Sequence, residues 1–230
     1  MDNSGIQFTS EMEITLDGAM GSEEDIIRAM IVSTNKDYDG WDDKRDTGRL
    51  NRIIRDHHSS PFEMCEMRFI IEVPIFVVRE LQRYRTANMN EMSGRYTELP
   101  PKFYIPKEEN IRTQVGKSMS YEYEMVKSPL TRALTLSGFT DVIEHTWEEY
   151  QLMLLNGVAR ELARAILPLN IYTKLMWKND LRNIVHFIVQ RTHPSAMLEI
   201  RELATKMEEI VAKEFPRFYK LWVENGRQDL

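Results

Sequence analysis

Hydrophobic and polar residues alternate along 62–73, FEMCEMRFIIEV, with the period of two that is typical of a half-buried strand. The apolar positions are Cys65, Met67, Phe69, Ile71 and Val73, and the polar ones are Glu66, Arg68 and Glu72. A further strand is predicted over 7–16, and the segment 100–106 (PPKFYIP) is predicted to be extended.

Other segments repeat their apolar residues every three or four positions, which predicts helices. The clearest such stripe lies near the C-terminus and ends near Pro216; it comprises Ile200, Leu203, Ala204, Met207, Ile210, Val211 and Phe215. Helices are also predicted at 158–167 and 181–191, and one with Ser22 as its N-cap and acidic residues in its first turn.

Three more helices have boundaries that depend on proline and glycine. A short helix is predicted from Leu50 to His58 after a polar loop at 35–48, another from Pro74 through Arg85, and a long one after Gly138. Helix therefore dominates and does not alternate regularly with strand. We predict an α+β fold with a small, mainly antiparallel sheet and several packed helices, as a single domain over 1–230.

Composition narrows the possible partners and the expected location. The chain has 230 residues, 42% hydrophobic and 29% charged, and a formal net charge of −6. This charge argues against duplex DNA or anionic membranes as the main partner. The single cysteine, the lack of an apolar run of about 18 residues and the lack of a basic, apolar leader indicate a cytosolic protein.

A polar cluster, RYRTANMNEMSGRY at 83–96, directly follows the apolar segment VPIFVVREL. Arg79 and Arg83 would lie one turn apart on the predicted helix, and Arg85 and Arg95 bracket the following segment. Several guanidinium groups together bind phosphate well, because each can form two parallel hydrogen bonds. The alternative is a solvent-exposed helix end with surface ion pairs.

Two further polar stripes are predicted on helices. Arg160 and Arg164 are spaced by four, opposite a buried side predicted to comprise Ala159, Leu162, Ala163 and Ile166. Arg182, His186 and Gln190 form a stripe on an otherwise apolar helix. A solvent-facing stripe is the default interpretation of both; a functional one requires that they face a shared cleft.

The sequence gives little support for a cysteine nucleophile, a metal site or a Rossmann or Walker nucleotide site. Cys65 lies on the apolar side of a strand, so we interpret it as a packed, unreactive thiol. His57 and His58 are adjacent and diverge on a helix, and no metal-binding spacing occurs, so no metal site is predicted. Neither GxGxxG nor a P-loop is present, so a Rossmann or Walker nucleotide site is not expected.

The polar cluster resembles the signature of the flavin-dependent thymidylate synthases, Arg-His-Arg, seven residues, then Ser. The matching residues are Arg83, Tyr84, Arg85 and Ser93, and Gly94, Arg95 and Tyr96 continue the likeness. Segments 57–64, 73–81, 95–106, 156–177 and 190–203 also resemble that family, in the same order. The resemblance covers most of the chain.

This resemblance implies a homotetramer whose active sites are shared between subunits, each holding FAD and deoxyuridylate (dUMP). In that family NADPH reduces the flavin, methylenetetrahydrofolate supplies one carbon, and the reduced flavin supplies the hydride that makes a methyl group.

The implied site residues follow from the matching positions. The nucleotide site would comprise Glu80, Arg83, Glu91, Ser93, Gly94, Arg95, Arg164 and Arg191. The flavin site would comprise Ser33, His58, Glu63, Arg83, Tyr84, Arg85, Asn90, Asp180, Arg182 and His186. Arg164 would bind the phosphate and Arg191 the pyrimidine. Arg191 and Ser93 are the implied catalytic residues, since Arg191 at a base carbonyl would polarise the ring.

Several residues depart from the family pattern. Tyr84 replaces the signature histidine, Asn88 a serine, Glu80 a glutamine, Asp180 and His186 asparagines, and Ser195 a histidine near the isoalloxazine. A carboxylate added near a phosphate or a reduced, anionic flavin would be repelled.

Three hypotheses follow. The first is reductive methylation of dUMP to dTMP. The second is transfer of the one-carbon unit to dUMP or dCMP to give a modified pyrimidine, hydroxymethylated if water quenches the intermediate. The third is a catalytically inactive protein that binds a nucleotide or flavin.

Overall fold

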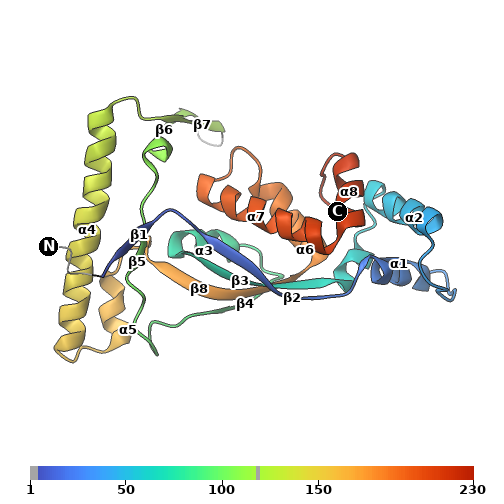
Figure 1. Cartoon of the computed structure of the whole chain (residues 1–230), viewed down its shortest axis with the longest axis horizontal. Coiled ribbons are helices and arrows are strands. Elements are labelled where there is room, and N and C mark those ends of the chain that lie inside the picture. The colour runs from blue at the N-terminus through green and yellow to red at the C-terminus, as the bar shows by residue number, and fades with distance from the viewer. Residues whose placement is uncertain (1–4, 118–119) are drawn as a thin grey trace. The chain divides into compact units, whose positions relative to one another are not determined.

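The computed structural model describes residues 5–117 and 120–230, so the first four residues of the N-terminal segment lie outside it. Its helices are α1 (Glu23–Val32), α2 (Asp43–Arg55), α3 (Ile75–Leu81), α4 (Pro129–Leu155), α5 (Arg160–Ala163), α6 (Leu181–Arg191), α7 (Leu198–Glu214) and α8 (Pro216–Glu224). Short 3-10 helices are η1 (Ser60–Met64), η2 (Glu108–Asn110) and η3 (Arg164–Ile166). The strands are β1 (Gln7–Thr9), β2 (Glu13–Met20), β3 (Glu66–Pro74), β4 (Asn88–Glu91), β5 (Lys102–Tyr104), β6 (Arg112–Lys117), β7 (Ser120–Met125) and β8 (Tyr172–Asp180). The α+β prediction is confirmed (Figure 1).

The largest sheet has four strands in the order β2-β3-β8-β4. The predicted inward positions of β3 are buried, which confirms the alternation in the sequence. Strand β8 was not predicted, although Thr173, Leu175, Trp177 and Asn179 are buried at every second position. Its period-two signal was available in the sequence and was overlooked.

The chain divides into two compact units, and the division passes through the long strands β3 and β8. Unit 1 comprises residues up to 13, 72–81 and 91–174; unit 2 comprises 14–71, 82–90 and 175–230. The single domain over 1–230 stays a prediction. No helix within 5–117 or 120–230 has the length and hydropathy of a membrane span.

In unit 1, α4 packs beside α5, as Figure 1 shows. Its core gathers Phe103 from β5 with Trp147 and Tyr150 from α4, the two aromatic pairs having ring centroids 5.8 and 5.1 Å apart. Strand β1 pairs with β5 in parallel, whereas β6 and β7 form an antiparallel hairpin.

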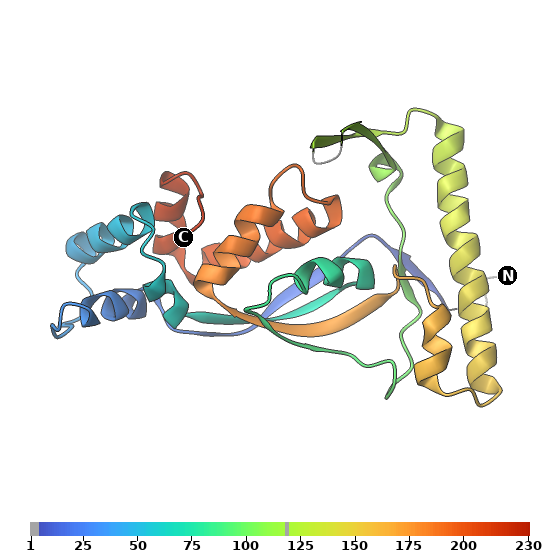
Figure 2. The ribbon, with the colours of Figure 1, turned by 180° about the vertical axis from the view of Figure 1, so that it is seen from behind.

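In unit 2, helices pack in consecutive pairs: α1 with α2, α6 with α7, and α7 with α8, which also contacts α2 (Figure 2). Phe62 on η1 lies against Phe218 on α8 at 5.4 Å between ring centroids. The predicted stripe on α7 is buried except for Ile210, which is half-buried. Helix α8, which begins at Pro216, was not predicted.

Several predicted boundaries were wrong. The strand expected at 7–16 is broken because Thr9 Oγ1 accepts a hydrogen bond from the Glu11 backbone N–H at 3.0 Å, a turn that separates β1 from β2. The N-cap at Ser22 is confirmed, since its side chain accepts from the Asp25 backbone N–H. Helix α3 begins after Pro74, which closes β3, and ends at Leu81.

Two helices begin earlier than expected, because side-chain caps outweigh the glycines inside them. Helix α4 begins at Pro129, where Ser128 accepts from the Thr131 backbone N–H at 3.2 Å. Helix α2 begins at Asp43 with Asp42 as its N-cap, within the predicted loop, and ends at Arg55 before the two histidines.

Candidate active site

The signature begins in turns between α3 and β4, where Arg83 and Arg85 are exposed and Tyr84 is half-buried. The prediction that Arg79 and Arg83 share a helical face is wrong, because the helix ends at Leu81. A turn follows, in which the Ala87 backbone N–H donates to the Tyr84 carbonyl at 3.2 Å.

In unit 2, Tyr84 meets the C-terminal end of α6. The Arg191 Nε donates to the Tyr84 phenol oxygen at 2.8 Å, and that phenol donates to Gln190 Oε1 at 3.0 Å. The Arg191 guanidinium also lies 5.3 Å from the centre of the tyrosine ring. Two implied site residues are thus brought together from distant parts of the chain.

The predicted polar stripe on α6 also includes His186 and Arg182. His186 packs edge-on against the Tyr84 ring, and its Nδ1 lies 2.5 Å from a carboxylate oxygen of Asp229. Arg182 is half-buried, and within the described part of the chain its Nε is a buried atom that has no hydrogen-bond partner. The stripe therefore faces protein groups at His186, which corrects the default solvent-facing interpretation there.

Asp180 caps the same helix. Its Oδ1 accepts from the Asn183 backbone N–H at 2.9 Å and its Oδ2 from the Asn183 side chain at 2.7 Å. Both carboxylate oxygens thus accept hydrogen bonds within the helix end.

In unit 1, the turn Ser93–Gly94–Arg95 rests on the short helix η3. Gly94 is buried, and a Cβ there would lie 3.0 Å from Arg164 Cδ. Arg95 Nε donates to Glu161 Oε2 at 3.0 Å, and Ser93 Oγ accepts from the Arg95 backbone N–H at 3.3 Å. The turn and the Arg164 side chain therefore lie against each other, as a shared anion site requires.

Glu91 and Arg160 complete the polar groups of this region. Glu91 accepts from Thr173 Oγ1 on β8 at 2.9 Å, and Arg160 lies 3.4 Å from Glu98 Oε1. On the short helix α5, the predicted buried side is correct for Ala163 but wrong for Leu162, which is exposed. Ala159 is exposed and Ile166 half-buried, because the segment is too short to bury a full helical stripe.

A cavity of about 720 Å³ lies in unit 2, lined by the predicted residues Ser33 and His58. Sequence reasoning missed its charged lining, which comprises Lys36, Asp37, Asp39, Arg45, Arg49 and Arg52. The spacing of the three arginines by four and three is a helical signal that would have found them. The volume lies within the usual range of ligand sites.

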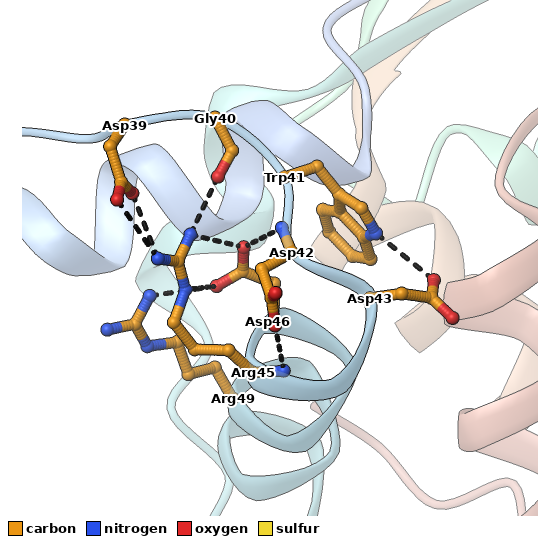
Figure 3. Close-up of polar contacts among 8 residues, drawn as sticks. All are labelled: Asp39, Gly40, Trp41, Asp42, Asp43, Arg45, Asp46 and Arg49. Carbon is orange, nitrogen blue, oxygen red and sulfur yellow. Dashed lines mark hydrogen bonds and ion pairs between the residues drawn. The ribbon is translucent and has the colours of Figure 1, made fainter.

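A buried carboxylate holds two of the three arginines of this cavity (Figure 3). Asp46 accepts from Arg45 Nε at 3.1 Å, Arg49 Nη1 at 2.8 Å and the Asp42 backbone N–H at 2.8 Å. These bonds, led by that from Arg45, lower the pKa of Asp46 to about 2 against the opposing effect of burial. Asp46 is therefore ionised at neutral pH and holds two arginines in place.

Four further implied residues have the following positions and exposures. Glu63 is exposed on η1, Arg85 is exposed, Asn90 is exposed on β4, and Glu80 is half-buried on α3. Among residues 5–117 and 120–230, no group of three or more His, Cys, Asp or Glu side chains is arranged to hold a metal ion.

Known proteins are similar to this chain over most of its length. Residues 15–217 match the family described as "Thymidylate synthase complementing protein". The chain belongs to this family. Flavin-dependent thymidylate synthases are similar to it along most of its length: that of Ehrlichia ruminantium (strain Gardel) is 39% identical over 212 residues, covering 89% of this chain and 68% of the relative. That of Thermus thermophilus is 36% identical over 206 residues, covering 90% and 73%.

Solved structures of the UMP/dUMP methylase PolB from Streptomyces cacaoi share the fold. The complex with 5-Br UMP has a TM-score of 0.89 and 31% identity, and that with 5-Br dUMP has 0.88 and 32%. Each comparison covers 98% of this chain and 100% of the other. Its family and these relatives show that the chain is an enzyme of the one-carbon transferase class.

Cys65 is packed in this family member, as the sequence predicted. It is fully buried, and burial raises the pKa of its thiol to about 12. Its Sγ donates to the Ser22 carbonyl at 3.4 Å. A thiol that stays protonated is a poor nucleophile, so this cysteine is unsuited to attack a pyrimidine ring.

The other departures from the signature lie in different settings. Asn88 is exposed at the start of β4. Ser195 is exposed in the loop after α6, where its Oγ lies 2.7 Å from His193 Nδ1. An imidazole thus lies beside Ser195, a position at which the chain departs from the family pattern.

Proposed function

We propose that the protein transfers the methylene carbon of methylenetetrahydrofolate to C5 of dUMP and reduces it to a methyl group, giving dTMP. The hydride comes from NADPH through FAD, so the balanced products are dTMP, tetrahydrofolate and NADP⁺. The names of the relatives support a flavin and a thymidylate product, and that of PolB supports a pyrimidine monophosphate. The single, packed thiol is suited to the reducing cytosol, where we expect the enzyme to act.

The observation that carries this proposal is the close packing of Gly94 against the Arg164 side chain. A Cβ added at Gly94 would lie 3.0 Å from Arg164 Cδ, so a side chain at this position would displace the Arg164 stem. This close packing brings the backbone of Ser93–Arg95 and a half-buried guanidinium to one place in unit 1. A guanidinium beside a turn that carries a serine hydroxyl is well suited to a phosphate, the role that the resemblance gives Arg164.

Residues of unit 2 would act on the base and the flavin. Arg191, held by Tyr84, would donate to a pyrimidine carbonyl and stabilise negative charge on its oxygen, which favours the enolate form of the ring in which C5 is nucleophilic. Bound FAD would supply the hydride. The cavity lined by Ser33 and His58 would suit a polar, phosphate-bearing cofactor such as FAD. Arg182, whose Nε is buried, would supply a further donor to it.

We further propose a homotetramer with shared sites. Helix α4 buries Ile143, Trp147 and Tyr150 but exposes other apolar residues, namely Leu130, Leu134, Val142, Leu152 and Leu155. Exposed apolar side chains gathered on one long helix are typical of subunit contacts.

A second substrate is favoured by one observation: the PolB structures contain 5-Br UMP as well as 5-Br dUMP. UMP is therefore a candidate beside dUMP.

The test is mass spectrometry of products from dUMP, UMP and dCMP with methylenetetrahydrofolate and FAD, with and without NADPH. We expect dTMP from dUMP and oxidation of one NADPH per product. A hydroxymethyl product without NADPH oxidation would support the second hypothesis instead. Absence of turnover with all three nucleotides would refute the proposed function and favour a binding protein.

A further inference from the structure

Tyr84 stands where the signature has a histidine, and its phenol is in contact with the two last residues of α6. The oxygen accepts from Arg191 Nε at 2.8 Å and donates to Gln190 Oε1 at 3.0 Å. A hydroxyl serves as donor and acceptor at once, so both bonds form without competition. The bond from the guanidinium is charge-assisted and is the stronger of the two.

The tyrosine ring is itself fixed. Phe187 meets it edge-on at 4.9 Å between ring centroids, with an interplanar angle of 80°. His186 does so at 6.0 Å and 67°, and Asp229 holds the His186 Nδ1 at 2.5 Å. Two consecutive residues of α6 therefore pack against the ring, so the position of its phenol oxygen is well defined.

Arg191 benefits from this support because it is the last residue of α6. A long arginine side chain at a helix end has many rotamers, and ordering it during substrate binding costs free energy. A fixed phenol bound to Nε and a ring beneath the guanidinium remove much of that freedom in advance.

We propose that Tyr84 is a positioning residue whose phenol orients Arg191 toward the pyrimidine. The tyrosine stands at the position of the signature histidine. The inference rests on the proposed function, in which Arg191 contacts the base. It assigns Tyr84 to the nucleotide half of the reaction, whereas the resemblance placed it with the flavin.

The experiment compares Tyr84→Phe with Tyr123→Phe. The first keeps the ring and removes the oxygen that binds Arg191. The second removes a phenol from β7 whose ring also lies under an arginine, with the Arg112 guanidinium carbon 5.7 Å from its centre. We expect Tyr84→Phe to lower kcat/KM for the nucleotide by about 10- to 100-fold, the usual range for a hydrogen bond to a charged group. Tyr123→Phe is expected to retain wild-type kinetics, and both variants a melting temperature near wild type.

A double-mutant cycle separates positioning from a structural role. In an Arg191→Lys background, which lacks Nε–H, Tyr84→Phe should cause no further loss. Losses that multiply, or full activity of Tyr84→Phe, would overturn the inference. If the wild type turns over no pyrimidine, the proposed function fails. Crystal structures of the two phenylalanine variants would then still test the inference. Arg191 should adopt several rotamers in Tyr84→Phe and a single rotamer in Tyr123→Phe. A single, unchanged Arg191 rotamer in Tyr84→Phe would contradict the inference.

Discussion

At the scale of single residues, the arginines of unit 1 are held in different ways. Arg95 pairs with Glu161 and Arg160 with Glu98, and all four side chains are about half exposed. Such pairs are screened by water and contribute little to stability. Arg164 instead packs its stem against buried Gly94, so its guanidinium is placed by the backbone of the turn.

Arg164→Ala is therefore expected to raise KM for the nucleotide by roughly 30- to 100-fold, because a phosphate loses a charge-assisted, bidentate partner. Steady-state kinetics with varied nucleotide would measure the change. Arg160→Ala, which removes the same charge four residues earlier, serves as the control and should leave KM within about twofold. Equal effects of the two variants would show that only the general charge of this region matters.

At the scale of elements, local signals were reliable where one side of an element is buried. The alternation in β3 and the apolar face of α6 both correspond to buried residues in the structure. The start of α2 was missed, since its cap depends on Asp42 and on the burial of Asp46. Burial of a charged residue is set by its partners, here Arg45 and Arg49, rather than by local propensity.

The turn between β2 and α1 supports a sharp test, because Gly21 lies where two segments nearly touch. Its φ is +87°, and a Cβ would come within 2.7 Å of Cys65 Sγ. Gly21→Ala should therefore lower the free energy of unfolding by about 3 kcal/mol, from the strained backbone and the clash together. Urea denaturation would measure this loss.

The matched control is Gly48→Ala. Gly48 lies inside α2, and a Cβ added there would meet no described atom within 4 Å outside its own helix turn. Alanine is the better helix former, so this variant should raise the free energy of unfolding by about 1 kcal/mol. A neutral Gly21→Ala would mean that the approach to Cys65 relaxes without cost.

At the scale of the whole molecule, the proposed assembly makes a prediction for α4. Leu134 is 64% exposed on a helix that buries Trp147 on another face. Leu134→Glu should give a species of lower mass than wild type in light scattering after size exclusion, because a charge there opposes subunit contact. Activity should fall in proportion to the loss of the larger species, because the proposed sites are shared between subunits. Gln151→Glu adds the same charge at an exposed polar position and should change neither. An unchanged mass for Leu134→Glu would exclude this face as the subunit contact.

The sequence by itself determined the fold class, the family, the packed thiol and most of the arginines of the candidate site. These depend on side-chain periodicity and on ordered motifs, both of which are local. Only the tertiary structure decided that Tyr84 bonds Arg191, that Gly94 rests on Arg164, and that Asp46 anchors two of the three arginines of the cavity. The first two contacts join residues far apart in the chain, and all three depend on the burial and orientation of side chains. Their energies arise from packing that no local pattern encodes.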